Sequence, residues 1–173
     1  DYRQPPQPTA AVIKPAVCTI TNILAQNTNN GGPSNDNPMT VPFNTLLGES
    51  WFIKSFASSE IKLMKGYYKI KWKVRGRSFE TFRSWLYKDS PGSSSQTVAN
   101  TVHNAMGAYT ATSNVASATS QGECFITILD ETEEYGIGVK CSHGSGNSTY
   151  GLGNATNWGG PEVYNEWEIT KLK

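Results

Sequence analysis

The sequence is poor in cysteine and in net charge. It has three cysteines among 173 residues, and its 15 basic and 14 acidic residues give a formal net charge of +1. Three thiols are too few for a secreted disulfide framework, and none has the paired short spacing of a zinc site. A chain without excess charge has no net field that draws it onto nucleic acid. No apolar run reaches the roughly 18–20 residues of a bilayer span. We therefore expect no nucleic-acid partner and no membrane insertion.

The sequence also lacks a catalytic signature. Its two histidines, His103 and His143, lie in low-complexity surroundings outside any recognisable motif. The late glycines precede no helical pattern, so they predict turns and not a phosphate-binding loop. We expect no enzyme activity and no cofactor. Calcium is the one alternative, because the acidic run at 130–134 and the loop at 35–37 supply oxygen ligands; neither has EF-hand spacing, and solvated turns explain both.

What the sequence has instead is the composition of a strand-and-turn protein. Only 17% of its residues are charged, 11% are aromatic, and Gly, Ser, Thr and Asn crowd the intervening segments. Period-two alternation recurs in short blocks, and no stretch has a helical period with caps. The clearest strand is 66–75, with Tyr68, Ile70, Trp72 and Val74 on one face. Further strands are expected at 11–24, 51–56, 60–64, 79–88, 122–130, 134–141 and 162–172, with two weaker ones inside 89–121. A single all-β domain follows.

Two of these strands are expected to form a hairpin, which brings two cysteines together. If residues 131–134 make a four-residue loop, Ile128 faces Ile137 and Cys124 faces Cys141. Opposed Cβ atoms in an antiparallel pair lie about 4.5–5.5 Å apart, so a cross-strand disulfide is one interpretation. The other, which we favour, is two buried thiols that serve as small hydrophobic side chains.

Charge runs in stripes along two of the expected strands. The basic stripe is Lys69, Lys71, Lys73 and Arg75, and the acidic stripe on the last strand is Glu162, Glu166 and Glu168. Alone, the basic stripe would suit an anionic glycan. If the two strands are neighbours in the sheet or across a subunit contact, the stripes neutralise each other as cross-strand pairs, and we favour this interpretation.

Several short blocks carry a resemblance. Asn44–Gly48 precedes a strand, and in Ile61–Ile70 a Gly-x-Tyr turn opens a central strand. This pattern resembles the trimeric jelly-roll superfamily of tumour necrosis factor and complement globular heads. The fuller pattern is most similar to bacteriophage virion fibre or spike head domains. Their shared blocks are seen here as Gly31-Gly32, Leu86-Tyr87, Gly151-Leu152-Gly153, Glu162-Val163-Tyr164 and Ile169-Thr170-Lys171-Leu172.

The resemblance implies a two-sheet antiparallel jelly-roll sandwich that assembles as a homotrimer. Residues 1–10 would form an extended Pro-rich linker from an upstream stalk, anchor or capsid protein, and residues 11–173 a single jelly-roll head domain. It implies a virion structural protein, a fibre or spike on the virion surface whose trimeric head binds a host cell-surface receptor or glycan. Two alternatives stay open: an extracellular, secreted or surface ligand of the tumour necrosis factor or complement type, and a virion-borne polysaccharide depolymerase.

Binding is expected in two loops, 27–37 and 143–158, because binding loops on rigid β scaffolds are rich in Asn, Gly, Ser and aromatic residues. The candidate receptor-binding residues are Asn30, Asp36, His143, Tyr150, Asn154 and Trp158. Trp158 would stack on a sugar face, or alternatively plug the trimer axis or the end of the sandwich. The five tryptophans fit a protomer that buries a flank against its neighbours, and they fit a monomer core equally well.

Overall fold

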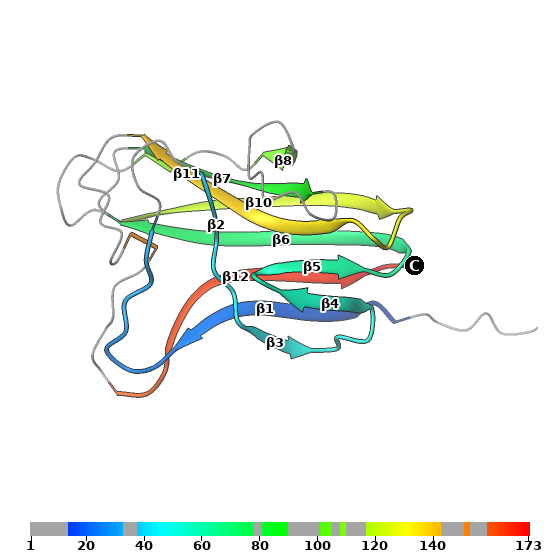
Figure 1. Cartoon of the computed structure of the whole chain (residues 1–173), viewed down its shortest axis with the longest axis horizontal. Coiled ribbons are helices and arrows are strands. Elements are labelled where there is room, and N and C mark those ends of the chain that lie inside the picture. The colour runs from blue at the N-terminus through cyan, green and yellow to red at the C-terminus, as the bar shows by residue number, and fades with distance from the viewer. Residues whose placement is uncertain are drawn as a thin grey trace, which may run out of the picture.

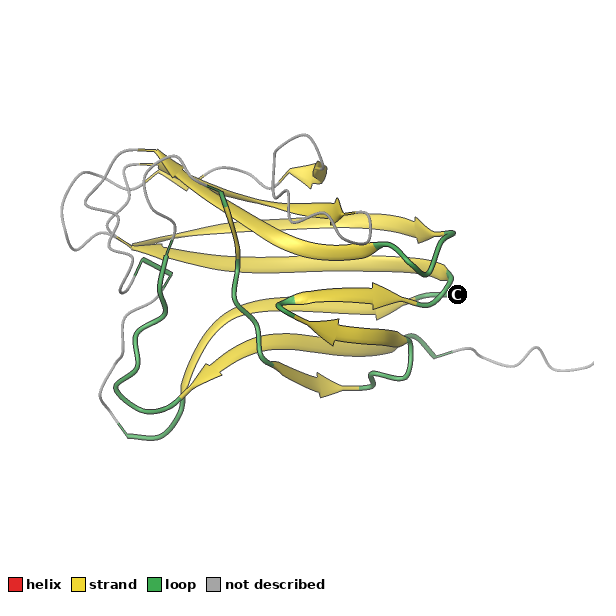
Figure 2. Cartoon of the chain, viewed as in Figure 1, coloured by secondary structure: helices red, strands yellow, loops and turns green. Residues whose placement is uncertain are grey.

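Every regular element in the described part of the protein is a strand. The computed structural model describes residues 14–32, 38–77, 81–89, 101–104, 108–109, 117–142, 151–152 and 159–173 (Figure 2). The strands are β1 (Ala16–Leu24), β2 (Met39–Thr40), β3 (Thr45–Gly48), β4 (Ile53–Ala57), β5 (Glu60–Leu63), β6 (Gly66–Arg77), β7 (Thr81–Asp89), β8 (Thr101–Asn104), β9 (Ala108–Tyr109), β10 (Ser117–Ile128), β11 (Glu134–Ser142) and β12 (Glu162–Lys171). Among these residues no helix is long and apolar enough to cross a membrane. The all-β prediction is confirmed.

The strands form two antiparallel sheets that enclose one core, the arrangement of a jelly-roll sandwich (Figure 1). The first sheet has five strands in the order β10-β6-β12-β1-β3. The second has the order β4-β5-β11-β7-β8, with β2 paired to β11 and β9 paired to β7. Strands that are distant in sequence, such as β1 and β12, are therefore neighbours in space.

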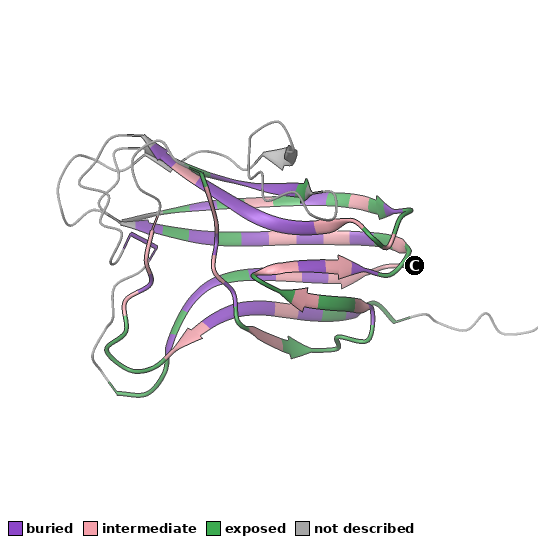
Figure 3. Ribbon diagram, in the orientation of Figure 1, coloured by how far each residue is buried: buried purple, intermediate pink, exposed green. Residues whose placement is uncertain are grey.

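Strand β6 organises the five-stranded sheet as its alternation predicts. It pairs with β10 on one side and with β12 on the other. Tyr68, Ile70 and Val74 are fully buried and Trp72 is nearly so, whereas the lysines between them are half-buried or exposed, so burial alternates along β6 (Figure 3). The apolar face of β6 thus lies on the core side and its basic face lies on the solvent side.

The seven-stranded sheet is buried on both faces where β7 meets β11. Leu86 and Ile137 lie in the core, yet Trp85 and Tyr87 on the opposite face of β7 are also fully buried. Their rings lie across two glycines of β11: an added Cβ on Gly136 would meet Tyr87 at 2.3 Å, and one on Gly138 would meet Trp85 at 2.5 Å. The sequence did not predict this second buried face, because alternation assumes that one face of a strand is wet.

A small polar cluster joins the two sheets where β10 passes β7. The Trp72 indole donates to Ser84 Oγ at 2.9 Å, and the hydroxyls of Ser84 and Ser120 are 2.8 Å apart. The Ser84 backbone N–H also donates to Ser120 Oγ at 3.0 Å. These contacts satisfy buried polar groups that would otherwise have no hydrogen-bond partner, and they fix the position of the Trp72 ring.

The predicted hairpin, and the disulfide with it, are wrong. The chain crosses from one sheet to the other between β10 and β11, so β10 pairs with β6 and β11 pairs with β7. Cys124 consequently faces Ile70 and Cys141 faces Phe82. Both residues, together with Cys18, are buried free thiols, as in the interpretation that we favoured. Burial is the main cause that raises the pKa of Cys124 to about 11, so this thiol stays protonated at neutral pH.

The two ends of the sandwich differ in what they carry. Ala16, the first residue of β1, pairs with Lys171 at the end of β12, so the amino-terminal and carboxy-terminal strands meet at one end. Leu24 pairs with Glu162 at the other end, where the chain leaves β1 and enters β12 (Figure 1). We call these the terminal end and the loop end.

Candidate functional site

The outer face of the five-stranded sheet is exposed in the described fold. No described strand packs across it, whereas the matching face of the other sheet is covered around Trp85. Near the terminal end, Tyr67 of β6 and Phe125 of β10 stack with ring centroids 5.8 Å apart and an interplanar angle of 17°. Tyr67 is 38% and Phe125 53% exposed. We call this pair the aromatic patch; an exposed aromatic pair on a rigid sheet is typical of a contact surface.

Charged rows continue from the aromatic patch along the same face. Glu123 lies opposite Lys71, which lies opposite Glu168, so a basic strand runs between two acidic ones. Lys69 reaches Glu123 at 2.8 Å, and Lys71 reaches Glu168 at 3.6 Å. The Lys69 hydrogen bond holds the pKa of Glu123 below its usual value. This confirms that the basic and acidic stripes lie on neighbouring strands, although Glu123 is a partner that the sequence did not suggest.

An open groove of about 450 Å³ lies over these charges. Its lining is mostly polar and comes from β6, β10 and β12: Lys71, Trp72, Lys73, Gln121, Gly122, Glu123, Glu166 and Glu168. Glu162, the third member of the acidic stripe, is not part of this surface, because it is buried at the loop end. The face therefore combines an aromatic terminal end with a charged, hollowed middle.

The described residues of the two predicted binding loops, 27–32 and 151–152, meet at the loop end. The Leu152 N–H donates to the carbonyl oxygens of Asn30 and Gly31 at 3.3 and 3.2 Å. The Asn30 side chain donates to the Leu152 carbonyl at 3.4 Å and accepts from Asn22 at 3.1 Å. Asn30 is only 2% exposed, so its side chain joins the loops and is not presented at the surface. The other five candidates, Asp36, His143, Tyr150, Asn154 and Trp158, lie outside the described residues.

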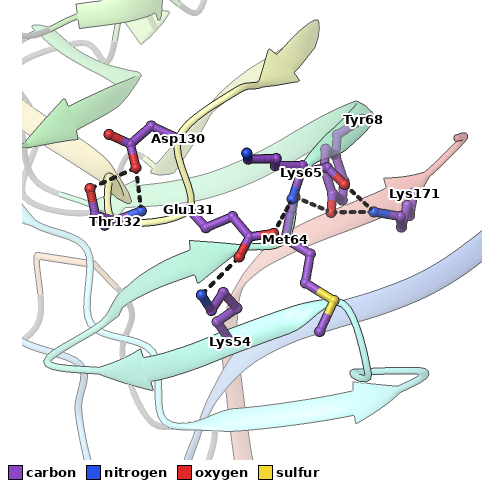
Figure 4. A network of polar contacts seen from close by, with 8 residues as sticks. All are labelled: Lys54, Met64, Lys65, Tyr68, Asp130, Glu131, Thr132 and Lys171. Carbon is purple, nitrogen blue, oxygen red and sulfur yellow. Dashed lines mark hydrogen bonds and ion pairs between the residues drawn. The ribbon is translucent and has the colours of Figure 1, made fainter.

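The acidic run considered for calcium is occupied by protein donors. The Thr132 N–H and hydroxyl donate to one oxygen of Asp130, at 2.9 and 2.7 Å, and lower its pKa (Figure 4). Glu131 accepts from the Lys54 ammonium at 2.8 Å and from the Lys65 backbone at 2.9 Å, which lowers its pKa as well. The remaining two carboxylates, Glu133 and Glu134, pair with Lys88 and Lys62. Among the described residues no three metal-binding side chains converge, and residues 35–37 lie outside the described part of the chain.

The last residues of β12 are fixed at the terminal end by a lysine. Lys171 donates to the Lys65 carbonyl at 2.6 Å and to the Tyr68 hydroxyl at 3.0 Å (Figure 4). Its ammonium also lies over the rings of Tyr68, at 4.9 Å, and Trp51, at 5.6 Å. Burial is the main cause that raises the pKa of Tyr68 to about 12. These contacts of Lys171 thus hold the terminal end together beside the aromatic patch.

Comparisons with known proteins agree with a jelly-roll sandwich. The crystal structure of murine APRIL at pH 5.0 matches with a TM-score of 0.60 and 10% identity, covering 92% of this chain and 100% of that one. The globular domain of zebrafish complement 1qA protein matches with a TM-score of 0.56 and 12% identity, covering 92% of this chain and 98% of that one. No family model and no curated protein matches the sequence.

At such low identity the likeness shows the fold alone. It confirms the expected two-sheet jelly-roll fold. The closer similarity to bacteriophage fibre or spike heads stays a prediction, as do assembly, partner and location.

Proposed function

We propose that this chain is a non-catalytic binding head that works as a homotrimer, with the outer face of the five-stranded sheet as its assembly surface. The observation that carries the proposal is the aromatic patch. Two stacked rings, one of them 53% exposed, lie on a sheet face that no described strand covers. Exposed aromatic groups of this kind are enriched in the cores of protein interfaces.

The charges on this face support a protein contact more than a solvent surface. Beside the aromatic patch lysines and glutamates alternate from strand to strand, so Lys69 and Lys71 are neutralised within the protomer. A face that brings its own counter-ions into a contact leaves few unpaired charges there, which lowers the cost of desolvation. The contrast with the other sheet, covered on both faces around Trp85 and Tyr87, points the same way.

The two ends of the sandwich give the trimer a direction. Both terminal strands meet at the terminal end, so attachment to an upstream stalk, anchor or capsid protein would place the loop end outward. At that end Asn30, from the predicted loop 27–37, contacts Leu152, from the predicted loop 143–158. We propose that the two loops bind a host cell-surface receptor or glycan, and that the protein is a fibre or spike on a virion surface.

A secreted or surface ligand is a second candidate, favoured by the likeness to murine APRIL and the zebrafish complement domain. The genes beside the coding sequence discriminate the two, because capsid or tail genes accompany a virion protein. The depolymerase alternative requires two carboxyl groups that are free to act on a glycosidic bond. Release of sugars from host capsule would support this alternative. The carboxylates Glu123 and Glu168 of the sheet face do not meet the requirement, because each is paired with a lysine.

The assembly surface is tested by Phe125→Glu. An unpaired carboxylate in a contact costs several kcal/mol, so the trimer dissociation constant should rise at least about 100-fold. Phe125 is half exposed in the protomer, so the fold should survive, which a circular dichroism spectrum checks. Leu129→Glu is the control, because Leu129 is 77% exposed in the turn after β10 and outside the patch. Equal trimer mass for both variants in sedimentation equilibrium would refute the assembly surface.

A further inference from the structure

The basic stripe of β6 is neutralised at one end only. Lys69 and Lys71 lie within 4.0 Å of carboxylates. Lys73 and Arg75 are exposed and make no ion pair with any described residue, although Glu166 lies opposite Lys73 in the strand register. Two cations therefore remain uncompensated toward the loop end of the face.

The strand pairing is interrupted beside these two cations. The register of β1 with β12 shifts between Thr21 and Asn22, so Asn165 has no partner residue on β1. The Thr21 hydroxyl lies 2.9 Å from the carbonyl oxygens of both Tyr164 and Asn165. The result is a β-bulge, a feature that redirects side chains and is over-represented near functional sites.

The bulge leaves one buried amide incompletely satisfied. Asn165 Oδ1 accepts from the Arg75 backbone N–H at 3.0 Å, just beyond the last ladder pair of β6 and β12. This bond fixes the orientation of the amide, because a flipped side chain would set two donors against each other. Asn165 Nδ2 is then a buried donor without a hydrogen-bond partner among the described residues. Such a group is stabilised by any acceptor that reaches it.

A small cavity lies at this point of the sheet face. It measures about 120 Å³, and its lining is Thr21, Lys73, Arg75, Val163, Tyr164, Asn165 and Glu166. That volume corresponds to roughly four water molecules, which suits one compact polar group and not a polymer segment. Lys73 and Arg75 make the lining net positive even with Glu166 included.

We propose that this cavity binds a single oxyanion group, a sulfate, phosphate or carboxylate, between Lys73 and Arg75 at the Asn165 bulge. A guanidinium presents paired donors that match such oxygens, and the lysine supplies a second positive charge. Glu166 is the internal competitor, because it is the one carboxylate in the lining. Arg75 lies eight residues from Tyr67 along β6, or roughly 27 Å, so the site is separate from the aromatic patch.

The test is a calorimetric titration of the intact protein with inorganic sulfate at constant ionic strength. Lys73→Gln and Arg75→Gln should each weaken sulfate binding about tenfold or more, as expected for a lost charge-assisted hydrogen bond. Glu166→Gln should strengthen it. Lys69→Gln is the matched control, since it removes the same charge from the same strand outside the cavity, and it should change the affinity less than about twofold. Melting curves and circular dichroism spectra check that each variant is folded.

Other results overturn the proposal. They are absence of saturable sulfate binding, equal weakening by Lys69→Gln and Lys73→Gln, and unchanged affinity in Glu166→Gln. Dextran sulfate distinguishes the sources of the anion: if only the polymer binds, the basic stripe acts as a diffuse surface and the cavity is not the site. Because the readout is affinity for a small ion, failure here leaves the trimer proposal intact, and loss of the trimer leaves this site testable.

Discussion

Replacing Gly122 with alanine tests how tightly the core is packed around Trp72, where β10 passes β7. Gly122 of β10 lies opposite Trp72 of β6, and an added Cβ would meet the Trp72 ring at 2.2 Å. Real Cβ contacts are never so short, so either the ring or the strand must move. The ring has little freedom to move, because its indole N–H is bonded to Ser84 between the sheets.

The expected loss of stability follows from two opposing effects. Overpacking a well-packed core costs about 1–3 kcal/mol. Alanine is better than glycine in a strand by about 0.5–1 kcal/mol. We therefore expect a net loss of about 1–2 kcal/mol. In a domain of this size that loss lowers Tm by about 2–8 °C.

The assay is urea unfolding followed by tryptophan fluorescence. The protomer concentration must be fixed, because self-association makes apparent stability depend on it. Gln121→Ala is the control, since it places the same residue one position earlier, on the exposed face of β10. A Gly122→Ala protein as stable as the wild type would refute the reasoning that the Trp72 ring is held in place.

Three further predictions concern the thiols, the acidic turn and the second buried face. The denatured, unreduced protein should titrate with three free thiols, and fewer than three would contradict the structure. The folded protein should resist alkylation of Cys124 at pH 8, because this thiol is buried and its pKa is raised. Glu131→Gln should lower Tm at pH 7, and the difference in Tm from the wild type should narrow below about pH 4. The reason is that a carboxylate with a lowered pKa stabilises the fold above its unfolded pKa and loses that effect as it is protonated. An equal difference at both pH values would show that the effect is not ionic. Tyr87→Phe should cost about 1–3 kcal/mol in urea unfolding, because the hydroxyl bonds Thr40 at 2.7 Å and Glu60 at 2.6 Å; no loss would show that these bonds are dispensable.

The sequence was sufficient where one strand obeyed one simple pattern. In β6, the alternation of Tyr68, Ile70, Trp72 and Val74 with basic residues predicted both the strand and its buried face. The basic stripe and the acidic stripe of Glu162, Glu166 and Glu168 indicated cross-strand pairs, either within the sheet or across a subunit contact, and the structure places β6 and β12 side by side in one sheet.

Sequence reasoning failed where pairing depended on the path of the chain. The short connection between β10 and β11 fits a hairpin and a crossing between the sheets equally well. Only the partners of the two strands decide between them, because β10 pairs with β6 and β11 pairs with β7. One feature of the sequence could have predicted the covered face at Trp85. Glycines at 136 and 138, alternating on β11, make room for large rings on a neighbouring strand.

Binding by the two loops stays a prediction, because five of the six candidate residues lie outside the described residues. The sixth, Asn30, is buried, and its amide donates to the Leu152 carbonyl of the other loop. The aromatic patch was not predicted, because Tyr67 and Phe125 are 58 positions apart and meet only through the β6–β10 register. The Asn165 bulge was equally hidden, since a bulge depends on the partner strand.

The measurement that tests the trimer most directly is the mass of the purified protein in solution. Sedimentation velocity at micromolar concentration should give a single species with the mass of three chains, each of 18.9 kDa. The Phe125→Glu protein should sediment as one chain under the same conditions. A wild-type protein that sediments as a stable single chain would contradict the assignment of the uncovered sheet face to assembly.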